Sequence, residues 1–147
     1  MTEHAPDPLA DDAFLEALLD TLIPPEGPMP GAGSLGLSED IRTGVVANTV
    51  LAAPVSAALS ALRTRALERE PGGFSALTQD AREQLLSSLM DEQPALGIFQ
   101  LFVFAGYYHN AKVLQALGLP GVPPFPRGHT IEETDPALLS KLASRRR

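Results

Sequence analysis

Apolar residues recur every three or four positions in several stretches of the chain, which is the spacing of one face of an α-helix. The first stretch predicts an amphipathic helix over residues 10–23. Asp11 and Asp12 lie near the positive end of its dipole, and Pro24-Pro25 ends it. Its apolar positions are Phe14, Leu15, Leu18, Leu19, Leu22 and Ile23.

A second helix is predicted over residues 39–70, with Ser38 as its N-cap. It is rich in alanine, so its surface allows close approach of another backbone. Pro54 lies inside it and is expected to kink or split it. A loop of prolines and glycines, long for a connection within a compact domain, joins it to the first helix and is therefore either functional or mobile.

Thr78 is the predicted N-cap of a third helix, which breaks near Gln93-Pro94. A fourth helix begins there and is apolar all round over residues 96–104, which predicts burial on most of its sides. It is expected to kink or end near residues 108–110.

A further short helical piece follows over residues 112–117, and Gly118 stops it. No alternating apolar and polar run is bounded by hairpin turns, so no strand is predicted. The fold class is therefore all-α: a compact bundle of four to five helices with an extended Pro/Gly-rich C-terminal arm.

The chain is expected to form a single helical domain over residues 1–147. Within it, residues 1–9 are a flexible N-terminus, residues 119–134 the extended arm and residues 144–147 a frayed tail. Asp135 and Pro136 start a last short helix that reaches residue 143.

Charge and composition exclude several classes of function. The net charge of −7 argues against nucleic acid as a partner, because neutralising phosphates requires a basic surface. There is no cysteine, so disulfides, thiolate metal sites and cysteine nucleophiles are ruled out. The longest apolar block, residues 96–108, is too short to span a bilayer, which needs about 20 residues.

The chain carries no recognisable catalytic or metal motif. It has no HExxH pair, no G-x-S-x-G elbow, and no Lys-Ser/Thr after the glycines of residues 31–36. His109 has two interpretations, a hydrogen-bonding group at an interface or pocket, or a helix-end residue that satisfies carbonyls. Tyr107 and Tyr108 either contact a partner, since a tyrosine combines an apolar ring with a polar tip, or pack one ring in the core while the other caps a helix end.

Three segments resemble the gluconate 2-dehydrogenase subunit 3 family. They are FLEALLDTLIPPEGPMPGA at residues 14–32, FSALTQDAREQLLSSL at residues 74–89, and GYYHNAKVLQALGLPGVPPFPRGH at residues 106–129. Their order and spacing cover most of the chain. The family comprises small subunits of membrane-associated sugar and sugar-acid dehydrogenases.

The resemblance implies a non-catalytic accessory subunit of an oxidoreductase complex. Its partner would be a large flavin-dependent subunit of the glucose-methanol-choline type, which holds FAD and oxidises a sugar or sugar acid, and a cytochrome subunit often takes the electrons. No cofactor or metal is expected in this chain, and no residue is expected to be catalytic. The residues expected to contact the partner are Met29, Pro30, Gly31, Ala32, Tyr107, Tyr108, His109, Asn110, Pro124, Phe125 and Arg127.

Members of this family commonly begin with a twin-arginine export signal, which this sequence does not show. As given, the chain is therefore expected to be cytoplasmic. Export with a partner, or removal of a signal, would place it in the periplasm.

Two alternatives belong to other classes of function. One is a self-associating helical protein without an enzyme partner, in which the alanine-rich second helix forms the seam of a homodimer. The other is a small-molecule or enzymatic site in a pocket under Tyr107, Tyr108 and His109.

Overall fold

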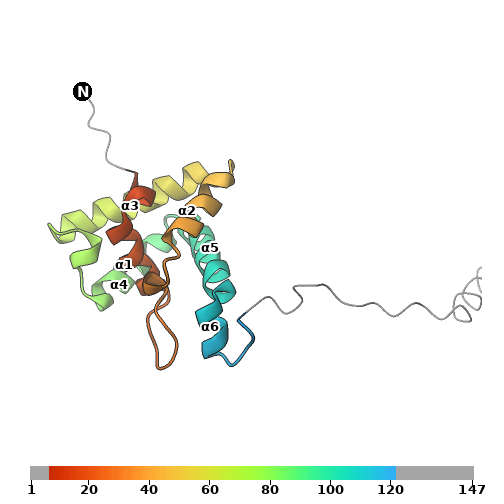
Figure 1. The fold of residues 1–147 in the computed structure, drawn as a ribbon. Helices are drawn as coiled ribbons and strands as arrows, with labels where there is room; N and C mark the ends of the chain where they lie inside the picture. The colour runs from red at the N-terminus through yellow and green to blue at the C-terminus, as the bar shows by residue number, and fades with distance from the viewer. Residues whose placement is uncertain (1–6, 122–147) are drawn as a thin grey trace, which may run out of the picture.

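The computed structural model describes residues 7–121, and its regular elements are all helical. This confirms the predicted all-α fold class (Figure 1). The α-helices are α1 (Asp12–Leu22), α2 (Ser38–Ala47), α3 (Ala52–Arg69), α4 (Gln79–Met90), α5 (Ala95–His109) and α6 (Ala111–Ala116). The 3₁₀ turns are η1 (Pro8–Ala10), η2 (Ala32–Leu35) and η3 (Phe74–Ala76).

Several expectations fall outside this range. They concern residues 1–6, the predicted arm from residue 122 onward, the helix predicted up to residue 143, and the tail at residues 144–147. The described start of the arm, residues 119–121, is not helical.

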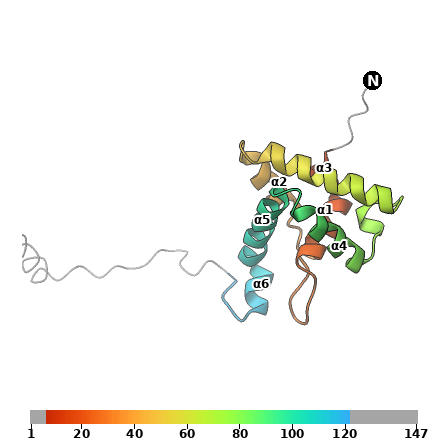
Figure 2. The same ribbon diagram turned by 180° about the vertical axis from the view of Figure 1, so that it is seen from behind.

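Helix α1 lies at the centre of the bundle and packs against η2, η3 and α4, while α3 crosses one end above η1, α4 and α5 (Figures 1 and 2). Helix α1 begins where the Asp11 carboxylate accepts a hydrogen bond from the Phe14 amide at 3.1 Å. Helix α1 ends at Leu22, one residue before the predicted end, and the two prolines follow. Leu15, Leu18 and Leu19 on its apolar face are fully buried, so α1 supplies the middle of the core.

The helix predicted over residues 39–70 is two helices, and the break differs in place from the expected one. Helix α2 ends at Ala47 because Asn48 turns the chain: its side-chain oxygen accepts from the amides of Val50 and Leu51 at 3.2 and 3.1 Å. Pro54 lies in the first turn of α3, where it has no intrahelical donor to lose. The N-cap prediction for Ser38 is also wrong, because Leu37 occupies the cap position and no side chain caps α2.

The other helix ends follow the predicted chemistry. The Thr78 hydroxyl caps α4 by accepting from the Ala81 amide at 3.3 Å. Asn110 ends α5 and caps α6, accepting from the Lys112 amide at 3.0 Å. Gly118 has φ +72° just after α6, the left-handed conformation that commonly ends a helix.

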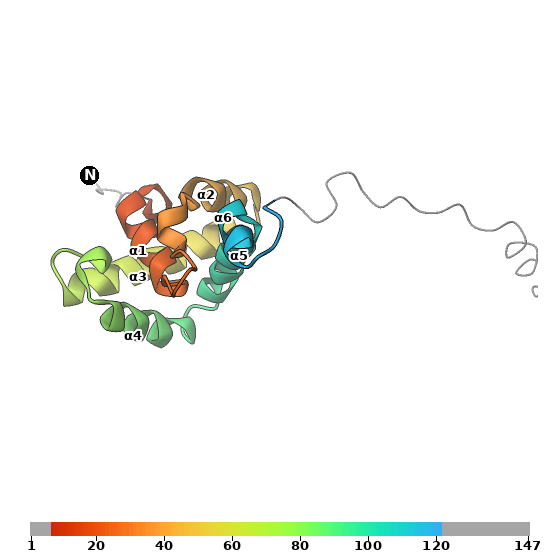
Figure 3. The same ribbon diagram turned by 60° about the horizontal axis from the view of Figure 1, so that its bottom comes forward.

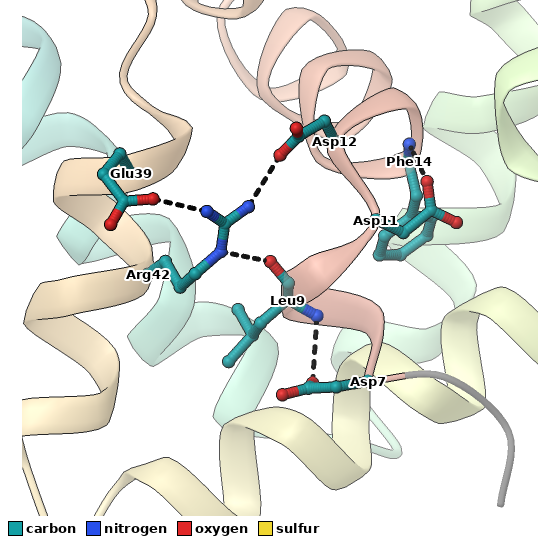
Figure 4. A network of polar contacts seen from close by, with 7 residues as sticks. All are labelled: Asp7, Leu9, Asp11, Asp12, Phe14, Glu39 and Arg42. Carbon is teal, nitrogen blue, oxygen red and sulfur yellow. Dashed lines mark hydrogen bonds and ion pairs between the residues drawn. The ribbon is translucent and has the colours of Figure 1, made fainter.

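Arg42 ties α2 to the N-terminal side of α1 (Figure 4). Its Nε atom donates to the Leu9 carbonyl at 2.6 Å, and its terminal nitrogens donate to Asp12 at 2.6 Å and Glu39 at 2.5 Å. The hydrogen bond to Asp12 is the main reason that the pKa of the guanidinium is raised above its ordinary value, with Glu39 adding to it. Arg42 therefore stays cationic over the whole working pH range and holds α2 in place against η1 and α1.

An Arg42→Lys variant is expected to lower Tm by a few degrees, because an ammonium group cannot reproduce the three-way fork of donors. Thermal unfolding at low and high salt tests this. Part of the loss should persist in high salt, since the bond to the Leu9 carbonyl is not an ion pair. Arg65→Lys is the matched control, because the Arg65–Glu92 pair is exposed and 3.8 Å long. Equal losses in the two variants would contradict a structural role for the Arg42 network.

Candidate docking surface

The loop between α1 and α2 is fixed by hydrogen bonds within itself and by a hydrogen bond to α1. Its start closes on itself, since the Ala32 amide donates to the Ile23 carbonyl at 3.0 Å and Glu26 pairs with Met29. The Gly33 amide donates to the Asp20 carboxylate of α1 at 2.8 Å. The loop is therefore an ordered part of the fold that fills the space between α1 and α5.

Two glycines let this loop lie directly on α1. A Cβ atom at Gly33 would collide with the Glu16 carbonyl oxygen and with the Asp20 carboxylate. A Cβ atom at Gly31 would collide with Asp20 and with Pro25. The absence of a side chain at both positions is therefore a packing requirement.

Tyr107 joins this loop to α5. Its hydroxyl donates to the Pro30 carbonyl at 2.8 Å, and its side chain is 1% exposed. Burial is the main cause that raises the pKa of Tyr107 above its ordinary value, and the neighbouring Tyr108 is the second cause. The phenol therefore stays protonated and able to donate. Two segments that were predicted separately to contact a partner thus contact each other.

The remaining predicted contact residues are placed differently. Gly31 and Ala32 are buried in the chain, while Met29 and Pro30 are partly exposed. Asn110 caps α6. Pro124, Phe125 and Arg127 lie outside the described residues. A partner role for these residues stays a prediction.

Tyr108 and His109 lie on the exposed side of the end of α5. The Tyr108 ring is edge-on to Tyr107, with centroids 5.1 Å apart, and its side chain is 53% exposed. The His109 Nδ1 atom is 2.6 Å from the Ala105 carbonyl oxygen. This contact agrees with the interpretation of His109 as a helix-end residue that satisfies a carbonyl.

Over residues 96–104 every position of helix α5 except Leu101 is buried or partly buried, so the predicted burial on most sides is confirmed there. The buried stripe is Leu96, Phe99, Val103 and Tyr107. Leu101, on the opposite face, is 65% exposed, and Ala105 is also exposed. The exposed side of the helix is therefore a narrow one that runs through Leu101, Ala105 and Tyr108.

Two adjoining hollows run along this uncovered face. One, of about 310 Å³, is lined by Leu51, Ile98, Leu101, Phe102 and Ala105. The other, of about 280 Å³, is lined by Asp40, Ile41, Phe102, Ala105, Gly106 and His109. They share Phe102 and Ala105, so we treat them as one surface and call it the α5 groove.

The α5 groove lies where α2 and α5 pack side by side (Figure 3). Gly44 of α2 faces the Phe102 ring, and Gly106 of α5 faces Ile41, so the two helices contact each other through these residues. The sequence has no Asp, Glu, Lys or Arg between Arg42 and Arg63, nor between Glu92 and Lys112. These two uncharged stretches meet at the groove, and depletion of charge with enrichment of aromatic residues is typical of the core of a protein interface.

Other kinds of site were sought over the same part of the chain. Residues 7–121 contain no group of three or more side chains placed to hold a metal ion. Among the helices of this range, none has the length and apolar character to cross a bilayer.

The model of the gluconate 2-dehydrogenase subunit 3 family matches residues 10–125. The chain belongs to this family. Comparisons with curated proteins and with solved structures gave no match. The family match spans the loop on α1, the whole of α5 and the α5 groove.

Proposed function

We propose that this chain is a non-catalytic accessory subunit that binds and stabilises a large FAD-dependent sugar or sugar-acid dehydrogenase subunit of the glucose-methanol-choline type. Membership of the subunit 3 family over residues 10–125 carries the proposal, because the family is named for a subunit of a dehydrogenase. In this proposal the flavin is held by the large subunit, and a cytochrome subunit can complete the complex.

The surface of the chain supports a binding role. An α-helix of a soluble protein that faces water normally carries polar residues on its outer side. Helix α5 carries no Asp, Glu, Lys or Arg, and it presents Leu101 and Tyr108 outward. An apolar face of this kind marks an interaction site, and a subunit of a larger complex needs one.

Co-expression tests the proposal. The large subunit of the complex is produced with this chain, with an empty vector, and with an unrelated small helical protein. We expect soluble, flavin-loaded and active large subunit only in the first case, as measured by flavin absorbance per protein and by turnover with an artificial electron acceptor. Equal solubility, flavin content and activity without this chain would refute the accessory role.

A second measurement tests which subunit carries the flavin and the dehydrogenase activity. After the subunits are separated, flavin should remain with the large one, and this chain alone should show no dehydrogenase activity. Flavin recovered with this chain would contradict the proposal.

A further inference from the structure

We propose that the α5 groove is the seat of an apolar α-helix of the large subunit, and that this helix carries a lysine or arginine at the end that faces Asp40. The inference rests on the proposed function and adds to it the place of docking and the chemistry of the docked segment.

The groove has the dimensions of a short helix. It extends along α5 from Ile98 to His109, which is about 16 Å at the rise of an α-helix, or three turns. Phe102 and Ala105 lie in both hollows and make the floor continuous. Leu51, at the start of α3, closes the apolar end.

The lining favours a helix over an extended strand. Every side chain around the larger hollow is a hydrocarbon: Leu51, Ile98, Leu101, Phe102 and Ala105. An extended segment laid there would bury backbone N–H and C=O groups without partners, which is costly. A helix satisfies its own backbone and offers an apolar stripe, as in other helix-in-groove complexes.

The polar end of the groove is formed by Asp40 and His109, and Asp40 is its only acid. Asp40 is exposed, lines the smaller hollow, and makes no side-chain hydrogen bond or ion pair with any residue in the range 7–121. Arg42, the nearest cation along α2, is committed to Leu9, Asp12 and Glu39. The matching group on a bound helix is therefore a cation placed against Asp40.

The same charges disfavour two other occupants. An anionic lipid surface attracts lysine and arginine, and neither flanks the outer face of α5 between residues 93 and 111. In a two-fold pairing of α5 with a second copy, the surface opposite Asp40 would come from the two uncharged stretches and would supply no cation. A helix from a different protein, apolar along one side and basic at one end, matches both the apolar lining of the groove and Asp40.

The test uses the tagged full-length chain co-expressed with the large subunit, and measures how much large subunit co-purifies. Leu101→Glu places a charge on the groove floor and should reduce the co-purified amount by about tenfold or more. Ala105→Arg, which keeps a good helix former, should act in the same direction by filling the groove. Leu67→Glu is the matched control, because Leu67 is 50% exposed near the end of α3 that lies away from α2 (Figures 1 and 2), and it should change recovery by less than about threefold.

Asp40→Asn tests the basic end of the partner helix. The purified complex should dissociate about threefold faster at low salt than the parent complex, and at the same rate in about 1 M salt, where the charge pair is screened. Glu68→Gln, an exposed acid on α3, is the control and should not alter the rate. Circular dichroism and Tm of each isolated variant confirm that it is folded.

The outcomes separate the two proposals. If the parent chain recovers the large subunit and both groove variants recover it equally well, the groove assignment is overturned and the accessory role stands. If the parent chain recovers no large subunit, the accessory role fails and the groove assignment with it. A parent chain that dimerises or sediments with lipid vesicles through Leu101, without binding the large subunit, would likewise overturn the assigned occupant.

Discussion

Replacing Gly33 by alanine is expected to lower the free energy of unfolding by about 3 kcal/mol, which corresponds to a Tm decrease of about 10 °C. The added methyl group would meet the backbone carbonyl of Glu16, which cannot move without deforming α1. The loop would have to lift, and the hydrogen bond from the Gly33 amide to the Asp20 carboxylate would lengthen or break. Denaturant unfolding of the purified chain measures the loss.

Gly97→Ala is the control for this prediction. Gly97 lies in α5, and a Cβ atom there meets nothing within 4 Å. Alanine should therefore be neutral or should stabilise the helix by about 0.5–1 kcal/mol. Similar losses in the two variants would contradict the contact of the loop with α1 as the source of the cost.

The helix ends that the sequence predicted correctly are the ones set by neighbouring residues. Pro24-Pro25 stops α1, Thr78 caps α4, and α5 ends within the predicted range 108–110. Each of these effects acts over a few residues, so it can be read without knowledge of the fold.

The break between α2 and α3 was predicted at the wrong residue because two local effects compete there. Pro54 is a strong helix breaker in a helix interior, but it is harmless in a first turn, and Asn48 had already ended α2. The signal that identifies the break is the side chain of Asn48, which bonds to the backbone two and three residues ahead. A polar side chain that turns the chain outweighed the continuous run of helix-forming alanines.

The site was harder to predict, because an apolar residue of a core and one of an interface look alike in sequence. Leu101 and Phe102 were predicted to be core residues, whereas Tyr107 was predicted to contact a partner; the structure exposes Leu101 and buries Tyr107. The sequence does show that α5 has apolar residues on every side. The rest of the bundle leaves one of these sides, at Leu101, exposed. The contact between Tyr107 and Pro30 joins distant segments, so no local rule predicts it.

Tyr107→Ala is expected to be among the most destabilising single substitutions in the chain, with a loss of about 3–5 kcal/mol. The ring is almost fully buried, at 1% exposure, and its hydroxyl anchors the loop at Pro30. Removal leaves a cavity between α5 and the loop and an unpaired carbonyl. Tyr108→Ala is the matched control on the neighbouring residue, and its loss should be much smaller because Tyr108 is half exposed. Comparable losses would contradict the assignment of Tyr107 as the link between α5 and the loop.

Tyr107→Phe isolates the hydroxyl and gives a distinctive pH dependence. Near pH 8 the variant should lose about 1 kcal/mol, the usual worth of one hydrogen bond. Burial raises the pKa of Tyr107 in the folded protein, so an unfolded chain ionises this phenol at about pH 10 while the folded chain keeps it protonated. The stabilisation from the hydroxyl is therefore complete below about pH 10 and falls as the pH rises through the folded pKa.

The measurable consequence is that the parent and Tyr107→Phe should converge in free energy of unfolding between about pH 8 and pH 11. Lysines and arginines titrate in both proteins alike, so their effect cancels in the difference. Tyr108→Phe serves as the control, because it removes the hydroxyl of a neighbouring tyrosine whose side chain is 53% exposed. A constant difference between the parent and Tyr107→Phe at all pH values would show that the Tyr107 phenol ionises no differently in the folded and unfolded chains, which would contradict its burial against the Pro30 carbonyl.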